Sequence, residues 1–148
     1  MPIRLATFAD LPQIIAIEQQ SQTAAHWAAS EYQRILTSGV SKHLVLVADE
    51  ASAILGFLVA TAAGPEWTLD NIVVAPDAQK RGLSSQLLSA LLSELGKRKA
   101  EAVFLEVRES NLAAIRAYEK SGFVLVGRRR HYYREPLEDA LLYRYKLT

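Results

Sequence analysis

The clearest pattern of apolar and polar positions in this chain lies between Trp67 and Leu95. Apolar residues recur from Trp67 to Val74, as in a strand, and a polar stretch from Gln79 to Ser84 follows. After this stretch, leucines recur at the three- and four-residue spacing of one helical face. They are Leu83, Leu87, Leu88, Leu91, Leu92 and Leu95. The pattern predicts a strand, a polar loop and a long amphipathic helix, in that order.

Shorter periodic segments fill the rest of the chain. A first helix is expected after Asp10, because Asp caps helices well and Pro12 is tolerated only in a first turn. A loop is expected over 19–25, a helix from Trp27 to Leu36 ended by Ser38-Gly39, and a helix over 111–121. Strands are predicted at 3–7, 44–48, 54–61, 102–107, 123–126 and 141–147, with an acidic turn at 49–50. This makes about seven strands and about four helices, a mixed α/β fold in a single domain spanning residues 1–148.

Composition narrows the class of protein. The chain has 148 residues, half of them apolar, with a net charge of +1 and no cysteine. Disulfides and a cysteine nucleophile are therefore excluded, and His26, His43 and His131 have no paired metal-ligand spacing, so no metal is expected. The start of the chain lacks the apolar core of a signal peptide, and the longest apolar run, 54–64, is shorter than the ~20 residues that span a bilayer. We expect a cytoplasmic protein without a membrane segment.

The polar loop before the leucine helix is a candidate anion site. Free N–H groups and the helix dipole favour negative charge at a helix start, and Lys80 and Arg81 add two cations there. Gly82 and this cationic pair could equally be a turn residue and a solvated corner. The loop is neither a P-loop nor a dinucleotide-binding glycine motif. From the loop alone, phosphate binding is one of two open readings.

A carboxylate interrupts the apolar strand over 102–107. Alternation places Val103, Leu105 and Val107 on one face and Phe104 and Glu106 on the other. Glu106 could point to solvent as an ordinary strand acid, or it could be a general base whose pKa is raised by apolar neighbours.

The next helix carries a second group of polar residues. Asn111 is placed to cap it, and Tyr118 lies two turns later on the same face, ~10 Å along the axis. Gly122 is placed to end the helix in the left-handed conformation, with Phe123 packing beyond it. Asn111 could be only a cap, and Tyr118 only a core aromatic.

Taken together, these motifs resemble the GNAT superfamily of acetyl-CoA-dependent N-acetyltransferases. The loop Gln79 to Ser84 is similar to the family signature Gln/Arg-x-x-Gly-x-Gly/Ala, with serine in place of the last small residue. The later signature, Asn-x-x-Ala-x-x-x-Tyr-x-x-x-Gly-Phe, is met by Asn111, Ala114, Tyr118, Gly122 and Phe123. The resemblance implies a twisted, mostly antiparallel sheet splayed in the middle and flanked by helices.

The resemblance also implies roles for individual residues. Acetyl-CoA, the expected co-substrate, would lie between the splayed strands, and Glu106 and Tyr118 would be general base and general acid. The residues expected to contact the cofactor are Ile72, Val73, Val74, Lys80, Arg81, Gly82, Leu83, Ser84, Ser85 and Asn111.

Within the superfamily, the chain is most similar to the bacterial ribosomal-protein-alanine N-acetyltransferases. The similarity lies in 105–108, 110–111, 129–130, 132–133, 138–140 and Trp27, whereas His26 and His131 depart from the usual proline and asparagine. It implies transfer to the N-terminal α-amino group of a protein, the N-terminal alanine of a small-subunit ribosomal protein. The residues expected to line the peptide site are Trp27, Arg129, Tyr132 and Tyr133.

Two other functions stay open at this level. One is a GNAT acetyltransferase acting on a small amine or an antibiotic, which would share the cofactor half of the site. The other is an RNA-binding module, suggested by the run of arginines and aromatics from Arg128 to Arg134. A net charge of +1 disfavours phosphate-driven binding, so no direct nucleic-acid contact is expected. The oligomeric state is not predicted.

Overall fold

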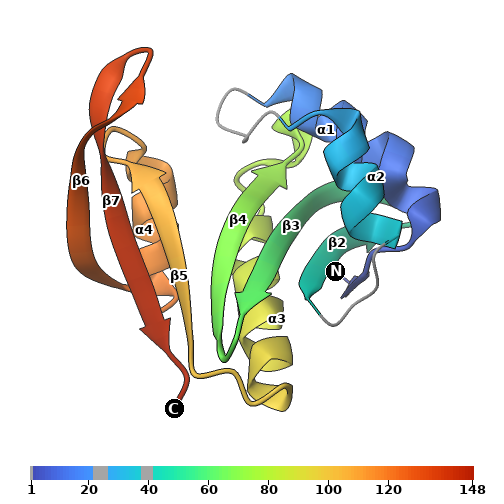
Figure 1. Ribbon diagram of the computed structural model, residues 1–148. Helices are drawn as coiled ribbons and strands as arrows, with labels where there is room; N and C mark the ends of the chain where they lie inside the picture. The colour runs from blue at the N-terminus through green and yellow to red at the C-terminus, as the bar shows by residue number, and fades with distance from the viewer. Residues whose placement is uncertain (1, 22–26, 38–41) are drawn as a thin grey trace.

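The computed structural model describes residues 2–21, 27–37 and 42–148. Their strands form one seven-stranded sheet in the order β1-β2-β3-β4-β5-β7-β6 (Figure 1). All neighbours are antiparallel except β4 and β5, which run parallel. The strands are β1 (Ile3–Leu5), β2 (His43–Glu50), β3 (Ala53–Ala63), β4 (Glu66–Val74), β5 (Ala102–Arg108), β6 (Val124–Arg134) and β7 (Leu137–Lys146). The predicted mixed, mostly antiparallel sheet is confirmed.

Four α-helices cover the two faces of this sheet. Helices α1 (Leu11–Gln20) and α2 (Ala29–Thr37) lie on one face, and α3 (Leu83–Lys97) and α4 (Leu112–Lys120) lie on the other (Figure 1). Two short 3-10 helices, η1 (Phe8–Asp10) and η2 (Pro76–Ala78), precede α1 and α3. The first helix begins at Leu11, directly after Asp10, as predicted, but the Asp10 side chain makes no capping hydrogen bond to α1. Its carboxylate accepts hydrogen bonds from Arg4 and from the Thr7 N–H instead.

The leucine face of α3 anchors the core. Leu83, Leu87, Leu88, Leu91 and Leu95 are at most 2% exposed, and Leu92 packs partly against them. A fully buried leucine contributes about 1.5–3 kcal/mol relative to an exposed one. The helix that connects β4 to β5 is thus held firmly against the sheet, as the spacing predicted.

The sheet opens between β4 and β5. These strands pair only where Glu66, Trp67 and Thr68 face Ala102, Val103 and Phe104. Beyond these pairs the two strands diverge, and Figure 1 shows them separating towards their C-terminal ends. A register shift against β3 at the same level leaves Asp70 as an extra residue, a β-bulge in β4. The predicted splay in the middle of the sheet is confirmed.

Several predicted boundaries need correction. The turn between β2 and β3 is Ala51-Ser52, and both residues have positive φ, whereas Asp49 and Glu50 belong to β2. Residues 19 and 20 belong to α1 rather than to a loop. The strand expected over 123–126 continues to Arg134, because the polar run pairs with β7 across a bulge at His131, which has a φ of 52°. The expected helix end at Ser38-Gly39 lies outside the described residues.

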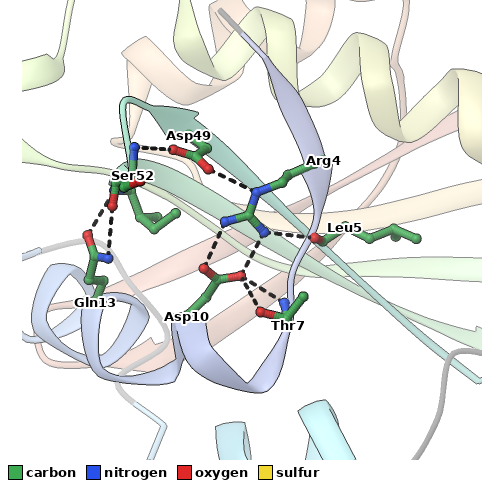
Figure 2. Close-up of polar contacts among 8 residues, drawn as sticks. Arg4, Leu5, Thr7, Asp10, Gln13, Asp49 and Ser52 are labelled. Carbon is green, nitrogen blue, oxygen red and sulfur yellow. Dashed lines mark hydrogen bonds and ion pairs between the residues drawn. The ribbon is translucent and has the colours of Figure 1, made fainter.

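A polar cluster ties the first strand to the first helix and to the β2–β3 turn (Figure 2). The Arg4 guanidinium donates two hydrogen bonds of 2.9 Å to the Asp10 carboxylate and one of 3.0 Å to Asp49. The Thr7 N–H also donates to Asp10, at 2.7 Å. Asp10 is 5% exposed, and the guanidinium holds its pKa below the usual value. Removing one partner would leave the other charge without its hydrogen bonds.

Gln13 extends this cluster from α1 to β3. Its amide donates to the Ser52 carbonyl at 3.2 Å and accepts from the Ile54 N–H at 2.9 Å. Asp49 accepts from the Ser52 N–H at 2.9 Å (Figure 2). The turn with two positive-φ residues is therefore held by side chains on both sides.

We predict that Asp10→Asn lowers the free energy of unfolding by about 1–3 kcal/mol at pH 7, because charged hydrogen bonds are lost. The folded-state pKa of Asp10 lies below the unfolded-state value of 3.8, so its contribution is complete above that pH. The contribution is lost as the pH falls through the folded-state pKa, and the difference between wild type and variant should shrink there. Urea unfolding at pH 7 and at about pH 3 measures both values. Glu31→Gln, which removes an exposed pair with Arg34, is the control and should cost less than about 0.5 kcal/mol at either pH. A difference that is the same at both pH values would contradict the assignment.

Candidate active site

The loop between η2 and α3 presents unpaired N–H groups. Lys80 and Gly82 have φ values of 65° and 77°, which turn the chain sharply into the helix. The first helical hydrogen bond runs from the Gln86 N–H to the Gly82 carbonyl, at 3.1 Å. The N–H groups of Leu83, Ser84 and Ser85 therefore have no intrahelical acceptor. This geometry can bind an anion such as a diphosphate.

The predicted cations of the loop are both exposed, but they differ in their contacts. Arg81 lies 3.3 Å from the Glu50 carboxylate of β2, and this ion pair partly neutralises its charge. Ser84, the departure from the family signature, is half-buried in the first turn of α3, and the helix begins normally around it. An ideal Cβ at Gly82 would have no heavy atom within 4 Å, so the loop is open at this point.

The ladder between β4 and β5 stops before the second half of β4. Ile72, Val73 and Val74 pair with β3 on one side, whereas the register with β5 ends at Thr68. The Val74 carbonyl accepts a long hydrogen bond, 3.4 Å, from the Gln79 side chain. An extended amide-containing ligand could pair with this free strand edge, with its anionic end near the start of α3.

Glu106 lies on β5 at the gap. The strand has the predicted alternation: Val103, Leu105 and Val107 are buried, and Glu106 is exposed on the other face. Its carboxylate lies 3.5 Å from the Arg129 guanidinium of β6. The neighbour of Glu106 is therefore a cation, not the apolar surroundings considered from the sequence.

Tyr118 lies at the end of α4 and is 7% exposed. The helix ends as predicted: the Phe123 N–H donates to the Tyr118 carbonyl and the Gly122 N–H to the Glu119 carbonyl, at 3.0 and 3.1 Å. This pair of bonds is a Schellman motif, and the Tyr118 and Phe123 rings pack at 5.9 Å. Burial raises the pKa of the Tyr118 phenol, and the nearby Tyr133 raises it further.

Asn111 has the capping role that its position predicts. Its side chain accepts a hydrogen bond from the Ala114 N–H at 3.3 Å. The residue is half-buried beside the end of β5. A contact with a cofactor stays a prediction.

The half of β6 nearest the hairpin turn and the end of β5 carry a cluster of stacked cations and aromatics, which we call the hairpin cluster: Arg108, Arg129, Tyr132 and Tyr133. The Arg108 guanidinium lies over the Tyr133 ring at 4.1 Å, and Arg129 lies 5.6 Å from the Tyr132 ring. The two tyrosine rings meet edge to face at 5.2 Å. Three of the four predicted peptide-site residues are thus together, next to Glu106.

Trp27, the fourth predicted peptide-site residue, lies elsewhere. It is half-buried against Tyr32 of α2, with ring centroids 5.4 Å apart. It therefore belongs to the α1/α2 side of the gap, whereas the hairpin cluster belongs to the β6–β7 side. The departure at His26 falls outside the described residues.

Sequence reasoning missed a polar group beneath α1 and α2. The Asn71 side chain of β4 donates to the Tyr32 hydroxyl at 2.7 Å, and both residues are buried. Burial raises the pKa of Tyr32, and Glu18 of α1, itself 3% exposed, raises it further. Two adjacent polar residues, Asp70 and Asn71, inside an apolar strand were the available signal. Their placement required the bulge, which the sequence pattern does not show.

Among residues 2–21, 27–37 and 42–148, no three or more His, Asp or Glu side chains are grouped to hold a metal ion. No helix in the same ranges is long and apolar enough to cross a membrane.

A splayed sheet with the unpaired N–H groups of a helix start at its opening is typical of an acetyltransferase of the GNAT type. The profile of the Acetyltransferase (GNAT) family matches residues 11–123. The chain belongs to this family, and acetyl-CoA, the acetyl donor of GNAT enzymes, is its co-substrate, as predicted.

Named relatives agree with the narrower resemblance. The chain is 37% identical over 147 residues to the [ribosomal protein bS18]-alanine N-acetyltransferase of Salmonella typhimurium, covering 95% of this chain and 93% of that protein. The crystal structure of the ribosomal-protein-S18-alanine N-acetyltransferase from Escherichia coli superposes with a TM-score of 0.86 at 32% identity, over 99% of this chain and 94% of that one. The yncA protein of Salmonella typhimurium, solved with acetyl-CoA, shares the fold at 19% identity, with a TM-score of 0.88 over 100% and 94% of the two chains.

We predict that Gly122→Ala destabilises the protein more than Gly64→Ala. Both glycines have positive φ, 102° and 65°, so both substitutions strain the backbone, by about 1–2 kcal/mol. A Cβ at Gly122 would also lie 2.9 Å from the Tyr145 ring, whereas at Gly64 it would meet nothing within 4 Å. The extra cost should be about 1–3 kcal/mol, measured by urea unfolding of both variants. Equal losses would show that the contact with Tyr145 relaxes freely.

Proposed function

We propose that this chain transfers the acetyl group of acetyl-CoA to the N-terminal α-amino group of a protein, the N-terminal alanine of a small-subunit ribosomal protein of the bS18 type. The observation that carries the proposal is the 37% identity to an enzyme named for this activity, along 95% of the chain. The match includes the acceptor half of the fold as well as the cofactor half. Residues 1–148 act as one catalytic domain, in the cytoplasm, where ribosomal proteins are made.

The cofactor half of the site fits acetyl-CoA. When bound, acetyl-CoA supplies an acetyl thioester. The N–H groups of Leu83, Ser84 and Ser85 bind its diphosphate, with Lys80, Arg81 and Gly82 forming the loop around it. The free edge of Ile72, Val73 and Val74 orients the pantetheine arm. Asn111, at the start of α4, contacts the cofactor near the thioester.

The proposed acid–base groups lie on β5 and α4, the strand and helix that come after α3 in the chain. Glu106 accepts the proton that the acceptor amine loses as its nitrogen bonds to the acetyl carbon. Tyr118 donates its hydroxyl proton to the sulfur as the carbon–sulfur bond breaks. Because burial raises the pKa of Tyr118, the phenol is fully protonated at neutral pH, but its proton is harder to release than that of an ordinary tyrosine.

An N-terminal amine suits this arrangement better than a lysine. Only the neutral amine attacks, and an α-amino group has a pKa of about 8, against about 10.4 for lysine. Glu106, which is paired with Arg129, is the group that takes the proton. An α-amino group is the more acidic of the two acceptors, so it gives up its proton more easily than lysine does. The acceptor peptide lies between Trp27 on one side and Arg129, Tyr132 and Tyr133 on the other.

The ion pairs of the hairpin disfavour the RNA-binding alternative. Arg128 contacts both Glu109 and Asp139 at 2.7 Å, and Arg129 pairs with Glu106. Two arginines of the run that suggested RNA binding are thus paired with carboxylates. This pairing weakens their attraction to RNA phosphates.

The acceptor class can be tested directly with purified protein. We expect acetyl transfer to a peptide with a free N-terminal alanine, and at least about tenfold lower kcat/KM for an N-blocked lysine peptide, spermidine and an aminoglycoside. Mass spectrometry of the products identifies the acetylated nitrogen. Preferred turnover of a small amine would replace this proposal with the small-amine alternative. Salt-sensitive binding of RNA without any acetyl transfer would favour the RNA-binding module.

The catalytic roles have a separate prediction. Glu106→Gln and Tyr118→Phe should each lower kcat by about 10²-fold or more, the usual range for acid–base groups. Glu101→Gln, an exposed acid before the same strand, and Tyr145→Phe, a half-buried tyrosine beside Phe123, are the matched controls. Both controls should stay within about twofold of wild type. The assigned roles are wrong if the two site variants behave like their controls in a steady-state assay.

A further inference from the structure

Asp70 stands across the gap from Glu106. The last register pair between β4 and β5 joins Thr68 to Phe104. Asp70 and Glu106 each lie two residues beyond this pair, on strands that run in the same direction. The two carboxylates therefore occupy the same level of the two diverging strands.

Both carboxylates also belong to the same face of the sheet. Trp67 and Val103 pair with each other and are buried, and Arg98, directly after α3, lies 5.6 Å from the Trp67 ring, so this pair belongs to the α3 face. Side chains alternate along a regular strand, so Glu106, three positions after Val103, faces the opposite way. Thr68 also faces away from the Trp67 side, Thr61 of β3 pairs with Thr68 and shares its face, and the Thr61 hydroxyl is hydrogen-bonded to Asp70. Asp70 and Glu106 are therefore on the α1/α2 face, which the peptide site of the proposed function also uses.

The Asp70 side chain is held in place from β3. The Thr61 hydroxyl donates a short hydrogen bond to Asp70 Oδ2, and the His43 Nδ1 atom of β2 lies 3.3 Å from the same hydroxyl. Thr61 thus engages only one of the two carboxylate oxygens. Partial burial raises the pKa of Asp70, which the Thr61 hydrogen bond and His43 oppose. Asp70 is the extra residue of the β-bulge, and a strand bends at a bulge. Bulges are common beside active sites, where they redirect a side chain.

We propose that Asp70 is a positioning residue that binds the acceptor amine as its ammonium ion. The proposal rests on the proposed function, in which the amine enters the gap beside Glu106. An α-amine is largely protonated at neutral pH, and a charge-assisted hydrogen bond to a carboxylate orients it. Asp70 orients the ammonium from β4, and the ammonium then loses one proton to solvent to give the neutral amine, the only form that attacks. Glu106 receives the second proton from the β5 side as the nitrogen–carbon bond forms.

Steady-state kinetics of Asp70→Asn test this role. The KM for an N-terminal alanine peptide should rise about tenfold, with kcat within about twofold of wild type and the KM for acetyl-CoA unchanged. Glu66→Gln, an exposed acid at the start of the same strand, is the control and should change neither constant. An unchanged peptide KM overturns the proposal, and so does a fall in kcat without a change in KM, which would make Asp70 an acid–base group.

Binding measurements separate recognition of the charge from a merely structural role. In calorimetry with CoA present, wild type should bind the alanine peptide about tenfold more tightly than the same peptide lacking its α-amino group. Asp70→Asn should bind the two peptides equally, with its affinity for the amine-free peptide unchanged. Equal loss of affinity for both peptides would overturn the proposal. If Asp70→Asn does not fold, Thr61→Val serves instead, with the preference for the amine reduced by about threefold.

A second acceptor distinguishes this proposal from the proposed function. The same kinetics are measured with spermidine, which also carries primary ammonium groups. If wild type acetylates spermidine but not the peptide, the proposed function fails, while the rise in KM for spermidine in Asp70→Asn still reports on the ammonium contact. If wild type acetylates the peptide and the KM does not change in Asp70→Asn, only the assignment of Asp70 fails.

Discussion

The short parallel pairing between β4 and β5 is the constraint on which the rest of the structure depends. Three residue pairs join the strands at one end, and nothing in the register joins them beyond Thr68 and Phe104. Parallel neighbours need a long crossover, and α3 supplies it with a leucine face that is almost fully buried. Helix α3 begins after β4 has diverged from β5, so the free N–H groups of α3 lie at the open end of the sheet. A free strand edge and a candidate anion site thus follow from one incomplete ladder.

The β6–β7 hairpin beside Glu106 carries several paired charges. Arg128 contacts Glu109 and Asp139, Arg129 contacts Glu106, and Arg108 lies 3.9 Å from Glu138. Such exposed pairs contribute about 0–1 kcal/mol each, so they orient side chains more than they stabilise the fold. The stability of the hairpin comes from its long ladder with β7, which pairs in turn with β5 along the whole of that strand. Glu106 therefore lies on a strand whose pairing with β7 is unbroken.

Features set by neighbours in sequence could be predicted from the sequence. The leucine helix, the start of α1 after Asp10 and the glycine that ends α4 all depend on contacts within one or two turns. The length of β6 could not, because its polar run has no apolar alternation and its pairing is decided by β7 and the bulge at His131. The same holds for the pairing of Glu106 with Arg129 and for the level that Asp70 shares with Glu106. These depend on register between strands that are distant in the chain, which periodicity does not encode.

The buried phenol of Tyr118 has a consequence for how the enzyme responds to alkaline conditions. An ordinary tyrosine begins to ionise near pH 10, whereas burial and Tyr133 move this ionisation higher. In the proposed function, in which Tyr118 protonates the departing sulfur, the donor therefore stays protonated at pH values where an ordinary tyrosine begins to ionise. Because only the neutral amine attacks, a rising pH increases the reactive fraction of an α-amine with a pKa of about 8, and the buried phenol keeps its proton throughout that rise.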